Sequence, residues 1–177
     1  MNIFVSTGLA LGIAVGLIIA AILIKVANTN HKMKTEYDER QLLIRGKGYM
    51  YAFYTILAYQ VVMMILSAGE IELPLERYAQ DCVGIILGCI VLGAYCIWND
   101  VYWGLNNNKK TYTIIFILAI FLNIIPIVGM AKGGTLVENG KIGMPILNIM
   151  VLFMMAVLGI ELIIKKVVNE KTGEQED

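Results

Sequence analysis

Five stretches of the chain are almost continuously apolar, and short polar segments separate them. They cover residues 3–26, 51–68, 82–98, 112–131 and 146–164. A helix needs about 20 apolar residues to cross a bilayer, and helices satisfy their own backbone polar groups in lipid. The sequence lacks the alternating segments of about ten residues that build membrane barrels. We therefore expect an all-α fold, a five-helix transmembrane bundle that forms a single integral membrane domain over residues 1–177.

The overall composition agrees with this pattern. Of the 177 residues, 58% are hydrophobic and 16% are charged, and the mean hydropathy is +0.72. An average soluble domain is about 25% charged. The first apolar stretch has no basic start and no small-residue cleavage motif, so we expect a retained anchor rather than a cleaved signal peptide. The formal net charge is zero, which argues against direct nucleic-acid binding because that function needs a basic face.

The basic residues are distributed unevenly between the two sides of the spans. Eleven of the 14 Lys and Arg residues follow the first, third or fifth span, whereas Arg77, Lys132 and Lys141 lie in the other two connections. Lys and Arg accumulate on the cytoplasmic side of membrane proteins. We therefore expect the N-terminus outside and the C-terminus inside a cell membrane (plasma or inner). The polar tail, residues 169–177, is expected to be disordered.

The stretch TEYDERQLLIRGK, residues 35–47, concentrates charge just before the second span. Thr35 and Asp38 resemble a capping box, and acidic residues suit the first turn of a helix. We therefore predict an amphipathic cytoplasmic helix over residues 35–47. Two interpretations stay open: an interfacial anchor held by its basic end, or a docking surface for a cytoplasmic protein. The second makes partner-binding candidates of four side chains, Glu36, Asp38, Glu39 and Arg40.

The same segment, YDERQLLIRGKGYMYAFY, resembles a loose group of small bacterial multi-pass membrane proteins. The matching residues are Asp38, Glu39, Arg40 and Gln41, followed by a basic, glycine-containing stretch and an aromatic-rich span. That group is largely uncharacterised, and its members often neighbour small helix-turn-helix regulators. The resemblance covers about 20 residues. It implies a regulatory or sensing partnership and carries over no catalytic residue.

Small residues recur every four positions in the first span, at Gly8, Gly12, Gly16 and Ala20. In lipid, such faces let two helix backbones approach closely. We expect this face to pack against another helix, either within the chain or in a second copy, which leaves a homo-oligomer open. Gly84 and Gly88 in the third span are candidates for the partner surface within the chain.

Three polar side chains inside the predicted spans are candidates for an intramembrane role. Gln60 and Asn123 lie near the middle of the second and fourth spans, and Glu161 lies near the inner end of the fifth. Intramembrane polar residues are costly and call for a functional hypothesis. We expect Gln60 and Asn123 to pair as interhelical contacts, with a small polar cavity for a ligand or proton as the alternative. Glu161 is expected to pair with Lys165, four residues further on.

The residue set offers little for catalysis. The sequence has one histidine, His31, and its three cysteines recur at every seventh position from 82 to 96. No nucleophile–base set, metal motif or intramembrane carboxylate pair is evident, so we expect no enzyme activity, no metal and no cofactor. The best-fitting role is a regulatory, sensing or interaction protein that uses its cytoplasmic juxtamembrane helix. The alternative is a subunit of a small-molecule or peptide transporter. The expected partners are the bilayer and either a cytoplasmic regulator or a transporter subunit.

Overall fold

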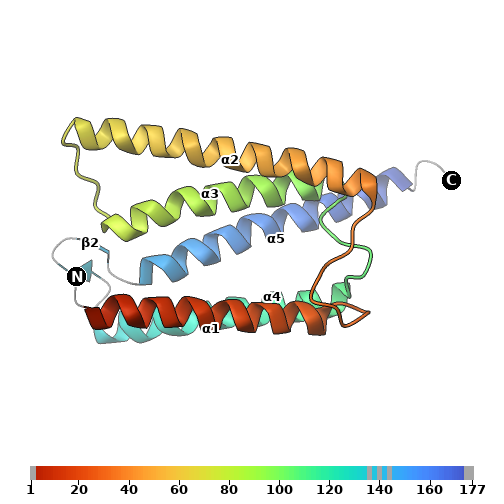
Figure 1. The fold of residues 1–177 in the computed structure, drawn as a ribbon, viewed down its shortest axis with the longest axis horizontal. Coiled ribbons are helices and arrows are strands. Elements are labelled where there is room, and N and C mark those ends of the chain that lie inside the picture. The colour runs from red at the N-terminus through yellow and green to blue at the C-terminus, as the bar shows by residue number, and fades with distance from the viewer. Residues whose placement is uncertain (1–2, 135–136, 139–140, 143–144, 174–177) are drawn as a thin grey trace. The chain divides into compact units, whose positions relative to one another are not determined.

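The computed structural model describes residues 3–134, 137–138, 141–142 and 145–173. Five long helices occupy most of this described chain (Figure 1): α1 (Ile3–Ala27), α2 (Glu39–Ala68), α3 (Arg77–Trp98), α4 (Lys109–Gly133) and α5 (Pro145–Gly173). Between α4 and α5, the two-residue strands β1 (Val137–Glu138) and β2 (Lys141–Ile142) pair in antiparallel fashion. The fold is thus helical, as the apolar pattern predicts.

Each of the five helices is long and apolar enough to cross a membrane, judged by length and composition. The qualifying segments are Ala10–Ala27, Glu39–Ala68, Arg77–Trp98, Lys109–Gly133 and Ile146–Lys171. They coincide with the five expected spans, and several extend beyond the apolar stretch into polar sequence. This arrangement is compatible with a multi-pass membrane protein.

The chain divides into two compact units that interleave along the sequence. One comprises Met1–Asp38 and Trp103–Ile117, and the other comprises Glu39–Tyr102 and Leu118–Asp177. The first contains α1, the loop that follows it and the beginning of α4. The second contains α2, α3, the remainder of α4, and α5. Each unit is described by itself below.

In the second unit, α3 packs against both α2 and α5 (Figure 1). Glycines on α3 permit this approach. A Cβ atom at Gly84 would lie 2.6 Å from Tyr59 Cδ1, and one at Gly88 would lie 2.7 Å from Ile56 Cδ1. Real Cβ atoms do not come so close to a neighbouring carbon, so a side chain at either position would force α2 and α3 apart.

Gly84 and Gly88 thus contact Tyr59 and Ile56 of α2. The expected pairing with the glycine face of α1 stays a prediction, because α1 and α3 belong to different units. In α1, the structure places no atom of the described chain within 4 Å of a Cβ built at Gly8, Gly12 or Gly16. The α1 face keeps its status as a predicted packing surface, and its partner stays open.

The charged segment before the second span is not a helix of its own. Residues 35–38 lie in a loop, and α2 begins at Glu39 and continues without a break to Ala68. The reason is local competition for backbone groups. The Glu36 amide donates to Asn106 Oδ1, and the Glu36 carbonyl accepts from the Leu105 amide. A backbone bonded to a second loop is not available for a first helical turn, so Thr35 does not cap α2.

The polar tail is also more ordered than expected. Helix α5 continues through residues 169–173, where disorder was predicted, while residues 174–177 lie outside the described part of the chain. Lys166 and Glu170 form an ion pair one turn apart, at 3.7 Å. Asn169 also donates to Asp100 Oδ1 at 3.3 Å. These contacts extend the helix beyond its apolar part.

Candidate functional site

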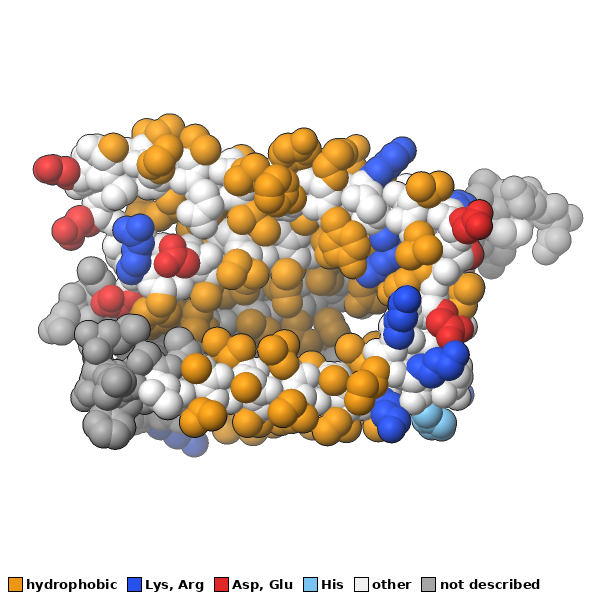
Figure 2. Space-filling model, viewed as in Figure 1, with side chains coloured by type: hydrophobic (Ala, Val, Ile, Leu, Met, Phe, Trp, Pro, Cys, Tyr) orange, Lys and Arg blue, Asp and Glu red, His pale blue; other side chains and the backbone are white. Residues whose placement is uncertain are grey.

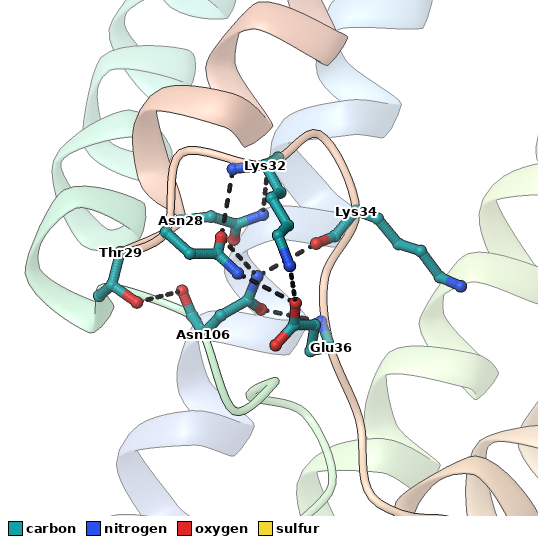
Figure 3. Close-up of polar contacts among 7 residues, drawn as sticks. Asn28, Thr29, Lys32, Lys34, Glu36 and Asn106 are labelled. Carbon is teal, nitrogen blue, oxygen red and sulfur yellow. Dashed lines mark hydrogen bonds and ion pairs between the residues drawn. The ribbon is translucent and has the colours of Figure 1, made fainter.

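Two loops of the first unit are joined by asparagine side chains at the polar end of α1. They are residues 28–36, which follow α1, and residues 104–108, which precede α4 (Figure 3). We call this region the asparagine junction. Asn28 and Asn107 also form an isolated antiparallel backbone bridge. The junction includes Glu36, the first of the four partner-binding candidates.

Asn106 forms the centre of the junction (Figure 3). Its side-chain oxygen accepts from the Glu36 amide at 2.8 Å, and its side-chain nitrogen donates to Asn30 Oδ1 and to the Lys34 carbonyl at 3.0 and 3.1 Å. Its backbone carbonyl accepts from both the amide and the hydroxyl of Thr29. The residue is only 5% exposed. Because a buried amide without partners costs about 1–3 kcal/mol, this complete bonding is what makes its burial tolerable.

Asn28 plays the same part at the end of α1. It is 1% exposed, and its side-chain nitrogen donates to the Lys32 carbonyl at 2.8 Å. Its side-chain oxygen accepts from Asn107 Nδ2 at 2.9 Å and from the Tyr112 hydroxyl at 3.2 Å. Asn107 Oδ1 in turn accepts from the Gly104 amide at 2.7 Å. One continuous network therefore fixes both loops and the first turn of α4.

Gly104 is required by the close approach of the two loops. A Cβ atom there would collide with Thr35 Cγ2 and would lie 2.8 Å from the Glu36 carbonyl oxygen. Only glycine leaves room for the backbone at residue 36 to pass. The Thr35 side chain therefore contributes a packing contact, rather than the helix cap that the sequence suggests.

The exposed side of the junction carries charge. Lys32 Nζ lies 3.0 Å from Glu36 Oε1, and Asn30 Nδ2 donates to the same oxygen at 3.1 Å. The Lys32 and Glu36 side chains are 65% and 45% exposed. A pair this exposed adds little to stability, so its main effect is to fix where the two charges are presented.

The structure places the other three partner-binding candidates directly after this loop. Asp38 ends the first unit, and Glu39 and Arg40 open α2 in the second unit. All three are exposed. Glu36 is thus tied into the junction, whereas the following three residues occupy the passage from loop to helix.

The intramembrane polar residues do not pair as expected. Asn123 donates to the Ala119 carbonyl of its own helix at 2.8 Å. Gln60 instead lines an open groove near the C-terminal end of α2. A side-chain amide can bond within its own helix or face a cavity instead of bonding to another helix. The predicted depth of Gln60 and Asn123 in the membrane therefore does not identify their hydrogen-bond partners.

Glu161 and Lys165 are not paired either. Lys165 Nζ lies 2.9 Å from Asp100 Oδ2, donates to the Trp98 carbonyl at 3.2 Å, and lies 5.9 Å from the centre of the Trp98 ring. This leaves Glu161 Oε2 buried without a hydrogen-bond partner in the described chain. Arg45 strengthens the same end of α3 by donating to the Val101 carbonyl at 3.3 Å. Arg45 of α2 therefore contacts the segment that follows α3.

The buried groups of the junction are amides rather than ionisable side chains. Asparagine amides do not titrate and are weak nucleophiles, and here the buried ones are already bonded. Among the described residues, no group of three His, Cys, Asp or Glu is placed to hold a metal ion. The three cysteines are free, and Cys96 is buried.

Sequence reasoning did not single out the asparagines of the junction. The available signal was their density, since both loops read as asparagine-rich: NTNHK at residues 28–32 and NNNKK at residues 106–110. Loop asparagines are usually explained by turn formation. What identifies the junction is that two segments 70 or more residues apart meet, which composition cannot reveal.

No protein-family model, curated protein or solved structure matches this chain.

Proposed function

We propose that the chain is a regulatory or interaction protein of the cell membrane whose juxtamembrane segment binds a cytoplasmic partner protein. The orientation in this proposal is N-terminus outside and C-terminus inside, from the distribution of Lys and Arg. It places residues 28–38 and 99–108 in the cytoplasm. The resemblance to bacterial membrane proteins that neighbour small regulators points to the same compartment.

The observation that carries the proposal is the asparagine junction. Residues 28–36 leave the membrane helix, yet they are bonded to residues 104–107 along their length. A loop already fixed in one conformation loses little entropy when a partner binds. The junction thus supports a pre-organised loop that presents Glu36. The exposed charges of Asp38, Glu39 and Arg40 follow directly along the chain, and we propose that they add specificity.

The proposal also accounts for the cost of burying two asparagines. A loop with only a connecting role needs no buried polar network, because exposed turns satisfy their backbone with water. Buried, fully bonded side chains instead define one conformation. We infer that the loop shape matters for binding.

Charge reversal tests this function. Asp38→Lys and Glu39→Lys, alone and together, should abolish recovery of the partner after mild cross-linking in native membranes and tagged purification. Glu170→Lys, an exposed acidic residue on α5, is the matched control and should retain the partner. Membrane abundance should be unchanged in all of them. Unaltered partner recovery with Asp38→Lys/Glu39→Lys would overturn the docking role, and a parallel loss of abundance would make these residues structural.

One observation favours a second candidate, a transporter subunit. Gln60, a polar residue within the span of α2, lines a groove that opens at the end of that helix. Polar side chains in spans often line substrate pathways. This alternative expects Gln60→Leu to alter solute flux while folding is preserved. Asn123→Leu is the comparison, because its amide bonds within its own helix and its loss should leave flux unchanged.

A further inference from the structure

A groove opens between α2, α3 and their connecting loop, residues 69–76. Its volume is about 980 Å³. Away from this end the two helices are held close, through Gly84 against Tyr59 and Gly88 against Ile56. The groove thus begins where the glycine contacts stop. All of it lies within the second unit.

Hydrogen bonds fix the walls of the groove. The Tyr59 hydroxyl donates to the Gln80 carbonyl at 2.6 Å, which joins α2 to α3, and Gln80 Nε2 donates to the Leu75 carbonyl at 2.8 Å, which holds the loop. At the end of α2, the Ile71 amide donates to the Leu66 carbonyl at 3.0 Å and Glu70 adopts a left-handed φ of 54°. The chain therefore turns sharply out of the helix and leaves the space between the helices open.

The lining has two chemical parts. Apolar side chains form one, and they are Met63, Met64, Leu66, Ile71, Leu73 and Leu75. Methionines adapt their shape to different apolar ligands. Ligand pockets of about 300–1,000 Å³ with mainly apolar walls and a few polar groups are typical small-molecule sites. The size of this groove falls in that class, and its walls combine these apolar side chains with polar and charged ones.

Charge forms the other part. Four carboxylates line the groove, those of Glu70, Glu72, Glu76 and Asp81, against the single guanidinium of Arg77. Arg77 Nε lies 3.9 Å from Asp81 Oδ1, so it offsets one of the four. Figure 2 shows acidic side chains at the end of α2 and the following loop. The remaining negative charge favours a cation and disfavours an anion.

Gln60 points independently to a polar occupant. It lies eight residues before the end of α2, which is about 12 Å deeper at the helical rise of 1.5 Å per residue. Its side chain is exposed and lines the groove. An amide at this depth in a span is costly in lipid and is tolerated where it meets water or a polar group. Polarity therefore extends from the acidic rim down into the span.

We propose that this groove binds a small amphiphilic organic cation, with its charged group among the carboxylates and its apolar body against the methionine and leucine side chains. The size, the apolar lining, the excess of carboxylates and the depth of Gln60 all fit such a ligand. The proposal does not depend on the cytoplasmic partner or on which side of the membrane the groove faces.

Fluorescence polarisation of rhodamine 6G, a lipophilic cation, tests the proposal on the full chain in lipid nanodiscs. We expect saturable binding that weakens with added salt, because screening reduces the attraction of carboxylates for a cation. Fluorescein, an anionic dye of similar ring structure, should not saturate. Equal binding of both dyes, or no saturable binding of rhodamine 6G to the full chain, would overturn the proposal.

Two variants locate the site. Glu72→Gln/Glu76→Gln keeps side-chain volume but removes two charges, and it should weaken rhodamine 6G binding about tenfold. Ser67 also lines the groove, on α2. Ser67→Trp keeps every carboxylate and fills this space, so it should abolish binding even if the charge variant misfolds. Glu170→Gln, outside the groove, should bind as the unaltered chain does. Unchanged affinity in both groove variants would contradict the assignment.

Discussion

At the scale of single residues, burial decides which polar side chains matter. Asn28 and Asn106 are almost completely buried, and the side-chain nitrogen and oxygen of each have hydrogen-bond partners, whereas Asn30 takes part in the same network from an exposed position. Water replaces lost bonds at an exposed site but not at a buried one. Replacing Asn28 or Asn106 by alanine should therefore cost more stability than the same substitution at Asn30.

We expect Asn106→Ala to lower the stability of the detergent-solubilised protein by about 2 kcal/mol. For a chain of this size, that corresponds to a fall in Tm of about 4–8 °C. The reason is that the backbone amide of Glu36 and the carbonyl of Lys34 lose their partner. Thermal unfolding followed by circular dichroism measures it. Asn30→Ala is the control and should change Tm by much less; equal effects would show that burial is not the deciding factor.

Removing the polar group of Glu161 is predicted not to lower the stability of the protein, unlike the removal of the Asn106 amide. One of its oxygens is buried and has no hydrogen-bond partner in the described chain. Replacing a buried, unsatisfied polar group by an apolar one of similar size is neutral or stabilising. Glu161→Leu should therefore leave Tm unchanged or raise it.

The comparison for Glu161 is Lys165→Leu on the same helix. It should lower Tm, because it leaves Asp100 without its 2.9 Å ion pair and removes a donor to the Trp98 carbonyl. If Glu161→Leu were instead the more destabilising of the two, the carboxylate would have a structural or ligand-binding role.

At the scale of helices, regularly spaced glycines have different packing contacts on α1 and on α3. Gly84 and Gly88 are buried against α2, whereas Gly8, Gly12 and Gly16 have no atom of the described chain within 4 Å of a Cβ position. The same spacing of small residues therefore contributes to packing on α3, while the partner of the α1 face stays open. Spacing indicates the capacity for close approach, not the partner.

Gly88→Ile should lower the stability of the protein by about 1–3 kcal/mol, the usual cost of overpacking a close contact. The added side chain would collide with Ile56 and separate α2 from α3. The loss of Tm in detergent, with monodispersity checked by size-exclusion chromatography, measures this effect. Gly12→Ile, the matched change on α1, should leave Tm of the monomer unchanged. If it abolishes self-association in membranes, the α1 face is an interface between copies.

At the scale of the whole molecule, the distribution of Lys and Arg predicts the orientation. In the proposed orientation, with the N-terminus outside and the C-terminus inside, a fluorescent protein fused after the C-terminus should fluoresce, and alkaline phosphatase fused at the same point should be inactive. Reporters inserted between Ile71 and Glu72 should give the reverse result, because that loop follows the second span. The same reporter being active at both positions would contradict the proposed topology.

The sequence by itself determined the helical class, the five spans and the proposed orientation. Apolar length and Lys/Arg asymmetry are properties of composition along the chain, and a bilayer responds to them directly. It also identified Gln60, Asn123 and Glu161 as unusual, because polarity within a span is visible without coordinates.

Only the tertiary structure decided which groups meet. Two asparagine-rich loops meet there, and α2 begins at Glu39 because the backbone of Glu36 is bonded to another loop. Lys165 forms its ion pair with Asp100 rather than with Glu161. The tertiary structure also opened the groove between α2 and α3. Each outcome depends on long-range contacts, in which a polar group takes the best partner that packing brings within reach. Local pattern determines the elements, and that competition determines their contacts.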